Sequence, residues 1–165
     1  MFAIHTDSPE GTLRFGRALA ALLQAGDVLC LTGNLGAGKT LLAKGIAAGL
    51  GVEEVVTSPT FTVLQVYEAR VPLYHFDLYR LEQAEELFDI GFDEFTAAQG
   101  ISIIEWADKF PGSMPDSYLW VEIRNGSDIA DRIIAVASRG SRYDNLCKEL
   151  KNFADPRIGN SHPGI

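Results

Sequence analysis

Gly33-Asn34-Leu35-Gly36-Ala37-Gly38-Lys39-Thr40 is the stretch that decides the fold of this 165-residue chain. It has a glycine, four free positions and then Gly-Lys-Thr, which is the pattern of a phosphate-binding loop. The residues before it, 27–32, are apolar and partly β-branched and predict a buried parallel strand. Apolar residues at helical spacing follow it, so a helix should begin at the end of the loop.

The residue types in this loop suit a nucleotide. Gly33, Gly36 and Gly38 allow backbone conformations that are costly for a residue with a Cβ, and they let the backbone approach a phosphate closely. Successive N–H groups then point inward at a helix N-terminus, where the helix dipole favours negative charge. Lys39 can reach the β- and γ-phosphates, and the Thr40 hydroxyl can ligate Mg²⁺. The alternative is a glycine-rich turn that binds nothing.

Composition narrows the class of protein. The length predicts one domain, residues 1–153, and the Gly-, Pro-, Asn- and Ser-rich residues 154–165 predict a flexible tail. The net charge of −8 argues against this chain holding nucleic acid alone, because phosphate contacts rely on Lys and Arg. Cys30 and Cys147 lack metal-site spacing and are interpreted as incidental thiols. With neither a signal peptide nor a membrane span predicted, the expected location is the cytoplasm.

The rest of the chain predicts alternating helices and strands. A capping serine, a proline and an acid at residues 8–10 predict a helix start. The apolar runs 61–67 and 71–78 are joined by too few residues for a helical crossover, so they predict an antiparallel hairpin. Further helices are expected over 82–89, 92–100 and 141–153, and further strands over 101–106, 118–123 and 132–137.

Two acidic residues lie in apolar segments. Asp77 is either solvent-facing or holds something specific, because buried acids need partners. His75 alternates with it, so both should point to one face of a strand, and a lone histidine is more often packed or hydrogen-bonded than catalytic. Glu105 ends a β-rich run and resembles the Walker B arrangement, in which a strand carries a carboxylate to Mg²⁺ beside the phosphate loop. Trp106 either belongs to the core or contacts a base or partner.

Five segments occur together and in order: GNLGAGKT at 33–40, SPTFT at 58–62, YHFDLYRL at 74–81, EELFDIG at 85–91 and IIEW at 103–106. In so short a chain they resemble the TsaE family, the small bacterial ATPase required for threonylcarbamoyladenosine modification of tRNA. The phosphate loop is shared with many unrelated NTPases, whereas the second and third segments are far more particular. The resemblance extends from about Ser8 to Arg132.

The resemblance implies an α/β fold, a three-layer P-loop NTPase with a mixed, partly antiparallel sheet. It implies binding of ATP or ADP with Mg²⁺, and ATP hydrolysis that is weak without partner subunits. The implied partners are the threonylcarbamoyl-transferase subunit and its non-catalytic paralogue, which are TsaD- and TsaB-like. The chain would act on that complex, with neither stable tRNA binding of its own nor a membrane role. In the family, the ATP cycle is thought to reset the transferase assembly between turnovers.

By position, the resemblance also implies roles for individual residues. Catalytic roles fall to Lys39, to Thr60 as a switch near the γ-phosphate, to Asp77 as a group that orients water, and to Glu105. Thr40 and Glu105 are the implied Mg²⁺ ligands. The implied nucleotide-binding residues are Ser8, Gly33, Gly36, Ala37, Gly38, Lys39, Thr40, Leu41 (through its backbone alone), Trp106 and Arg132.

Two departures from the family pattern leave the phosphate and metal ligands in place. Leu41 stands where many relatives have a second threonine, and Ala107 stands where they usually have proline. A small-molecule P-loop kinase is the main alternative, but residues 109–115 contain no arginine for a lid. A nucleotide-dependent binding switch without turnover is also open. A GTPase is disfavoured because no Asn-Lys-x-Asp segment is present.

Overall fold

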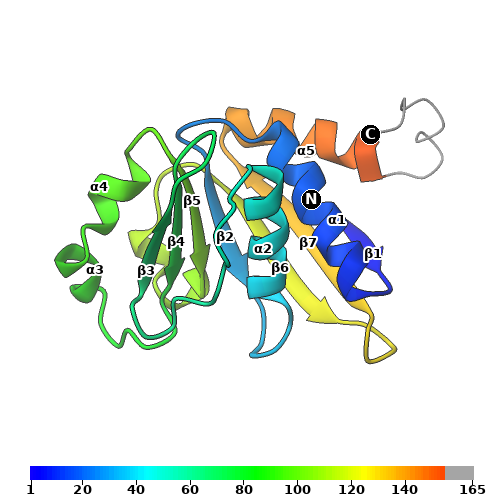
Figure 1. Ribbon diagram of the computed structural model, residues 1–165, viewed down its shortest axis with the longest axis horizontal. Coiled ribbons are helices and arrows are strands. Elements are labelled where there is room, and N and C mark those ends of the chain that lie inside the picture. Colours follow the sequence, from blue (N-terminus) through cyan, green and yellow to red (C-terminus); the bar gives the residue numbers. More distant parts are fainter. Residues whose placement is uncertain (155–165) are drawn as a thin grey trace.

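The computed structural model describes residues 1–154, which build one seven-stranded sheet with helices on both faces (Figure 1). The strands follow the order β1-β7-β6-β2-β5-β4-β3 across the sheet. Their bounds are β1 Phe2–Thr6, β2 Val28–Thr32, β3 Leu64–Tyr67, β4 Leu73–Asp77, β5 Ile101–Glu105, β6 Tyr118–Asn125 and β7 Arg132–Arg139. The helices are α1 Pro9–Leu22, α2 Lys39–Gly49, α3 Glu86–Asp89, α4 Phe92–Thr96 and α5 Ser141–Ala154, with short 3-10 turns at Ala107–Lys109 and Pro111–Ser113.

Parallel pairing holds the middle of the sheet, and antiparallel pairing holds both margins. Strands β6, β2, β5 and β4 pair with one another in parallel, in that order. Strand β3 pairs antiparallel with β4, as the predicted hairpin requires, and β6, β7 and β1 form an antiparallel meander. The mixed sheet between helical layers confirms the predicted fold class.

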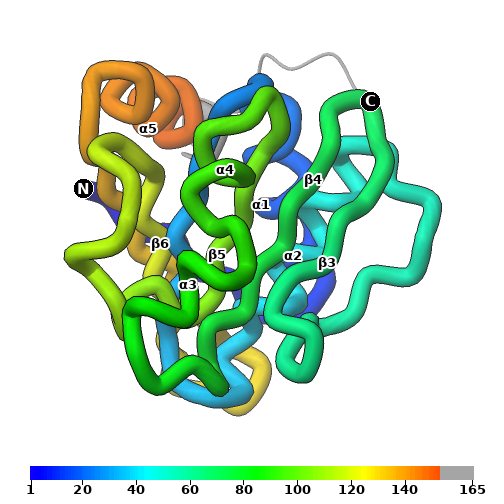
Figure 2. Tube along the Cα trace, turned by 90° about the vertical axis from the view of Figure 1, so that its left-hand side faces the viewer, coloured from blue at the N-terminus to red at the C-terminus, as the bar shows by residue number. Residues whose placement is uncertain are grey.

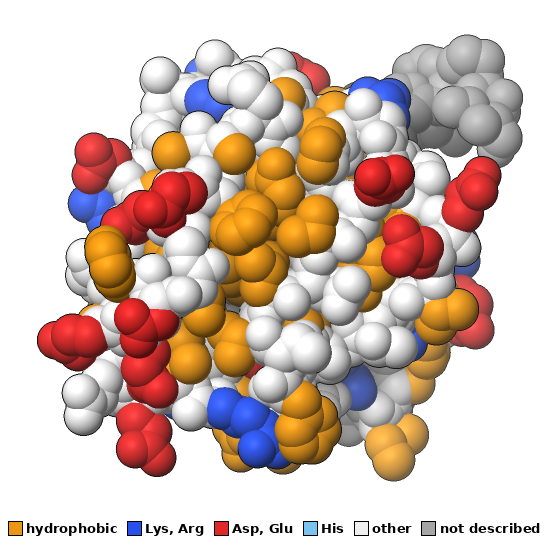
Figure 3. Space-filling model, turned by 60° about the vertical axis from the view of Figure 1, so that its left-hand side comes forward, with side chains coloured by type: hydrophobic (Ala, Val, Ile, Leu, Met, Phe, Trp, Pro, Cys, Tyr) orange, Lys and Arg blue, Asp and Glu red, His pale blue; other side chains and the backbone are white. Residues whose placement is uncertain are grey.

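Each face of the sheet has its own core because side chains alternate along every strand. In β2, Leu29 and Leu31 pack into the larger core with α1, α2 and α5. Val28 and Cys30 point the other way, into the smaller core under α3 and α4. Figure 1 shows α3 and α4 on the side of the molecule away from β1, and Figure 2 shows them in front of β5. Acidic side chains gather on this side (Figure 3). Phe88 of α3 is 80% exposed.

Two predicted helices are shorter than expected, and one strand was not predicted. Strand β1 was not expected, because its five residues offer only Phe2 and Ile4 to the core, and its partner β7 lies far along the sequence. The helix predicted over 82–89 is only α3, because the Glu86 carboxylate accepts the N–H groups of Glu82 and Gln83 and holds them in a turn. The helix predicted over 92–100 ends at Thr96.

The predicted last helix is present and extends to Ala154, one residue further than expected. The predicted flexible tail therefore loses its first residue to α5, and residues 155–165 lie outside the described part of the chain. Within residues 1–154, no helix is both long and apolar enough to cross a bilayer.

The topology brings the predicted site residues to one edge of the sheet. The loop between β2 and α2 passes the carboxyl ends of the parallel strands (Figure 1). Asp77 and Glu105 are the last residues of β4 and β5, and they are register partners across that parallel pair. Ligands of open α/β sheets bind at this edge.

Candidate functional site

The loop at residues 33–38 has the backbone that its glycines predict. Gly33, Gly36 and Gly38 have φ values of 141°, 78° and 110°, in the region that favours glycine. A Cβ on Gly33 would also collide with the carbonyl oxygen of Ile123 on β6. Gly38 is the N-cap of α2, and the start of that helix has no side-chain cap, so its first N–H groups are left without a capping side chain.

Lys39 lies over the loop that precedes it. Its ammonium donates to the carbonyl oxygens of Gly33 at 2.6 Å and Asn34 at 2.9 Å. The same Nζ lies 4.1 Å from the ring centroid of Trp106, within range of a cation–π interaction. Burial lowers the pKa of Lys39, and the negative charges of Glu105 and Asp77 oppose that shift. Phosphate oxygens could replace the two carbonyls as acceptors.

Thr40 and Glu105 join the head of α2 to the end of β5. The Thr40 hydroxyl donates to Glu105, with its Oγ1 at 3.0 Å from Oε1 and 3.3 Å from Oε2. His75 Nε2 lies 2.9 Å from the same Oε1. Glu105 is only 2% exposed, and His75 is fully buried. The predicted pair of metal ligands is therefore in direct contact, and the histidine is hydrogen-bonded, as its interpretation from sequence favoured.

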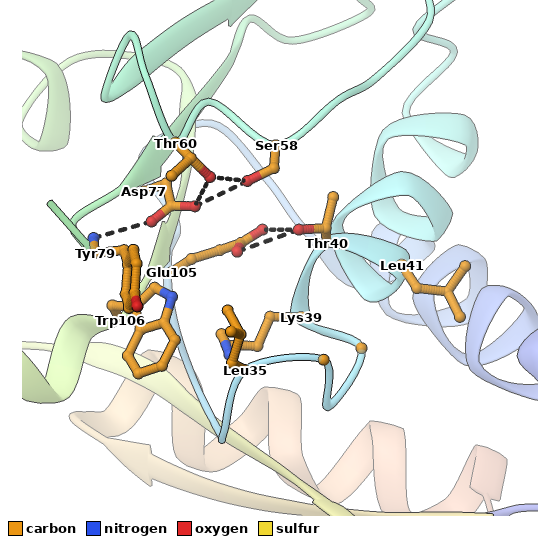
Figure 4. Close-up of a pocket in the computed structure, with 12 residues that line it drawn as sticks. Leu35, Lys39, Thr40, Leu41, Ser58, Thr60, Asp77, Tyr79, Glu105 and Trp106 are labelled. Carbon is orange, nitrogen blue, oxygen red and sulfur yellow. Dashed lines mark hydrogen bonds between the residues drawn. The ribbon is translucent and has the colours of Figure 1, made fainter. Parts of the chain in front are cut away.

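Asp77 is held by a different set of donors (Figure 4). Its Oδ2 accepts from the hydroxyls of Ser58 at 2.9 Å and Thr60 at 3.0 Å. Its Oδ1 accepts from the backbone N–H of Tyr79 at 3.0 Å. The two hydroxyls also lie 2.7 Å apart. The SPTFT segment therefore reaches the site by folding over the end of β4.

The backbone is unusual at two residues next to these acids. Val63 and Trp106 have φ values of 65° and 61°, which few residues other than glycine adopt, and for a β-branched valine such a value is an outlier. Val63 closes the turn that carries Thr60, and its carbonyl accepts from the N–H of Asp77 at 2.8 Å. The left-handed turn at Trp106 places its indole between Lys39 and Tyr79, whose ring centroid is 4.9 Å away (Figure 4).

Most of the predicted site residues line one pocket. Three further residues of its wall, Leu35, Ser58 and Tyr79, were not among the predicted site residues. The hydroxyl of Ser58, two positions before Thr60, was the available signal in the sequence. The predicted residues in the wall are Gly36, Gly38, Lys39, Thr40, Leu41, Thr60, Asp77, Glu105 and Trp106.

The other four predicted residues lie outside that wall. Gly33 and Ala37 line an adjoining hollow beside the end of β6. Arg132 donates through Nε to the Ala37 carbonyl at 2.8 Å, so it supports the loop from behind. The Ser8 hydroxyl accepts from the N–H of Gly11 and caps α1.

Charge is unbalanced at this edge of the sheet. Asp77 and Glu105 are both 2% exposed, and among residues 1–154 neither has a Lys or Arg nitrogen within 4.0 Å. Their partners are hydroxyls, an amide and an imidazole. Buried charges in proteins are generally paired or coordinate a metal, because desolvated charge is costly, so these two carboxylates could hold a cation.

The sequence profile described as "Threonylcarbamoyl adenosine biosynthesis protein TsaE" matches residues 6–134. The chain belongs to the TsaE family. A relative from Bacillus subtilis (strain 168), named tRNA threonylcarbamoyladenosine biosynthesis protein TsaE, is 43% identical over 146 residues, 88% of this chain and 90% of the relative. A relative of the same name from Treponema pallidum (strain Nichols) is 43% identical over 130 residues, 79% of this chain and 96% of the relative.

A solved structure agrees with the family. A crystal structure of YdiB from Bacillus subtilis superposes with a TM-score of 0.81 at 36% identity, and the match covers 93% of this chain and 96% of that one. The TsaE profile spans every residue of the pocket wall, from Leu35 to Trp106. It ends before α5, so that helix belongs to the part of the chain outside the profile.

Proposed function

We propose that this TsaE-family chain binds ATP and ADP with Mg²⁺ and hydrolyses ATP slowly. We propose further that it is required for threonylcarbamoyladenosine modification of tRNA, and that it acts on the threonylcarbamoyl-transferase complex rather than on tRNA. The observation that carries the proposal is the hydrogen bond between Thr40 and the buried Glu105. Thr40 lies in the first turn of α2, directly after the glycine-rich loop. A phosphate cradle and a carboxylate for the metal thereby meet at one point.

The residues at the head of α2 are suited to a triphosphate and its metal. Thr40 donates its hydrogen to Glu105, which leaves its oxygen lone pairs for a cation. Among residues 1–154, no cluster of three His, Cys, Asp or Glu side chains could hold a metal alone. This suits Mg²⁺, which usually takes one or two protein groups together with phosphate oxygens. When bound, the ion would neutralise charge on those oxygens during phosphoryl transfer.

Asp77 is the candidate for orienting the attacking water. Its carboxylate faces the same pocket as Lys39 and Glu105 and can accept a hydrogen bond from water. Ser58 and Thr60 fix that carboxylate from a loop, so a ligand at the terminal phosphate position could rearrange them. No arginine from residues 1–154 lines the pocket wall. Slow hydrolysis by the isolated chain follows, since arginine fingers contribute much of the rate in comparable enzymes.

The role in tRNA modification is supported by the names of the relatives and by charge. The relatives from Bacillus subtilis and Treponema pallidum are both named for tRNA threonylcarbamoyladenosine biosynthesis. A net charge of −8 and the acidic surface around α3 and α4 (Figure 3) disfavour tRNA binding by this chain alone. The proposed partners are therefore proteins, the TsaD-like transferase subunit and its TsaB-like paralogue, in the cytoplasm.

The test is ATP hydrolysis with and without those two partner subunits. We expect slow, Mg²⁺-dependent turnover that rises when the partners are added. Lys39→Ala should lower the rate about 100-fold, because it removes a charge aimed at the reacting phosphates. Lys44→Ala is the matched control, since Lys44 lies on the same helix but is exposed.

The same assay separates the alternatives. Tight nucleotide binding without turnover, even in the complex, would favour a binding switch. Phosphorylation of a small acceptor would favour a kinase. Fast turnover by the lone chain, unaffected by the partners, would contradict the proposed role of the complex. Failure to bind ATP or ADP in magnesium buffer would overturn the proposal altogether.

A further inference from the structure

We propose that His75 is a positioning residue that holds the Glu105 carboxylate in place for Thr40 and the metal. This inference deepens the proposed function and rests on it. His75 lies on β4 and Glu105 on β5, and these strands are parallel neighbours. Nε2 of the imidazole lies 2.9 Å from Oε1 of the carboxylate, and both side chains are buried.

Two side chains form hydrogen bonds with the Glu105 carboxylate, and only one of them is expected to contact the metal as well. Thr40 contacts both carboxylate oxygens, but its hydroxyl is also the group expected to meet the metal. The bond from His75 comes from behind, from a residue that does not line the pocket. Because Glu105 has several rotatable bonds, the histidine is the partner that keeps its orientation when Thr40 takes on another contact. Groups that orient a metal ligand in this way commonly change metal affinity when they are replaced.

The second ring nitrogen supports the direction of this bond. Nδ1 of His75 is buried and has no hydrogen-bond partner among the described residues. A hydrogen on Nδ1 would therefore be a buried donor without an acceptor, which is costly. The geometry assigns the hydrogen to Nε2, from which it is donated to Glu105, and leaves Nδ1 bare.

Substitutions at His75 separate positioning from packing. His75→Leu removes the donor and keeps an apolar side chain in the core. His75→Gln keeps an N–H donor at a similar reach. Phe76→Leu is the matched control, because Phe76 is the next residue on β4 and is buried in the opposite core. ADP affinity is measured by calorimetry in Mg²⁺ and in chelator, together with the Mg²⁺ concentration that gives half-maximal binding.

We expect His75→Leu to raise that Mg²⁺ concentration about tenfold, in line with measured effects of groups that support a metal ligand. Affinity in chelator should not change, His75→Gln should restore most of the Mg²⁺ effect, and Phe76→Leu should show none. Equal losses with and without Mg²⁺ would indicate packing alone and overturn the inference. So would a normal Mg²⁺ requirement in His75→Leu.

A spectroscopic readout keeps the inference testable even if His75→Leu does not fold. NMR of nitrogen-labelled histidine, with the His75 signal assigned by its loss in His75→Gln, reports which ring nitrogen carries the hydrogen. The Nε2-protonated form is expected, and a ring protonated on Nδ1 with a bare Nε2 would overturn the proposal. If the wild-type chain binds no nucleotide, the proposed function fails, while the spectrum still tests the bond between His75 and Glu105.

Discussion

Asp27, just before β2, and the pair Asp77 and Glu105, at the opposite end of the strands, are all at most 3% exposed. Asp27 is balanced within the fold. Arg142 of α5 donates to both of its carboxylate oxygens, at 3.0 and 2.7 Å, and the N–H of Gln24 adds a third bond. Asp77 and Glu105 receive hydrogen bonds of similar length from hydroxyls, an amide and an imidazole, and no guanidinium of residues 1–154 contributes one.

The difference separates a carboxylate that stabilises the fold from two carboxylates that we propose serve a site. The bidentate pair at Asp27 fastens the last helix to the first buried strand, and its charge is neutralised internally. At the other end of the strands, hydrogen bonds hold the carboxylate oxygens in position, and within residues 1–154 no Lys or Arg nitrogen lies within 4.0 Å of them. Under the proposed function, this arrangement would cost stability at Asp77 and Glu105, and a bound cation would offset that cost.

The largest expected effect is on turnover. Glu105→Gln keeps the size of the side chain and a carbonyl acceptor but removes the charge that would serve the metal. ATP hydrolysis by the assembled complex should fall about 100-fold, as when one preorganised electrostatic group is removed from other active sites. Glu85→Gln, on the exposed acidic surface, is the control and should retain full activity. A rate within a fewfold of wild type would mean that Glu105 belongs with Asp27 as a structural group.

The second effect is on stability, and it compares the two ends of the sheet directly. Asp27→Asn removes the counter-charge of Arg142, and because that arginine is partly exposed, a loss of about 1–3 kcal/mol is expected. Asp77→Asn removes an unpaired buried charge, so the free energy of unfolding without metal should stay level or rise. Urea unfolding of both variants in chelator measures the difference. Similar losses for the two variants would mean that Asp27 and Asp77 play the same part in stability.

The sequence predicted which residues meet at this edge of the sheet better than it predicted how they contact one another. The loop at 33–40 was found from its own local pattern of glycines, lysine and threonine. The acids at 77 and 105 were found because each lies in a single apolar run of the sequence. The contact of His75 with Glu105 joins residues 30 positions apart and depends on the order of β4 and β5, which no local pattern encodes. Strand β1 was missed for the same reason, and Arg132 proved to hold the loop through Ala37.

Cys30 shows a third way to bury an ionisable group, which is to keep it neutral. It lies on β2 in the smaller core, fully buried, and burial raises the pKa of its thiol from 9.0 to about 12. Between pH 9 and 12 the unfolded chain therefore releases this proton while the folded chain retains it, so stability falls as pH rises through that range. Burial likewise raises the pKa of Tyr143 to about 12, and that group adds to the loss above pH 10.

The smallest predicted effect is the part of this alkaline loss that belongs to Cys30. Between pH 9 and 10, ionisation of the Cys30 thiol in the unfolded chain should lower the free energy of unfolding by about 1 kcal/mol. This value follows from the linkage relation with a thiol pKa of 9.0 in the unfolded chain and about 12 in the folded chain. Cys30→Ala lowers stability at every pH by leaving a cavity, but its loss over this interval should be smaller by that amount. Cys147→Ala, at a half-buried thiol, is the control and should change the pH dependence less. Parallel curves for wild type and Cys30→Ala would show that the Cys30 thiol ionises in the folded sheet as readily as in the unfolded chain.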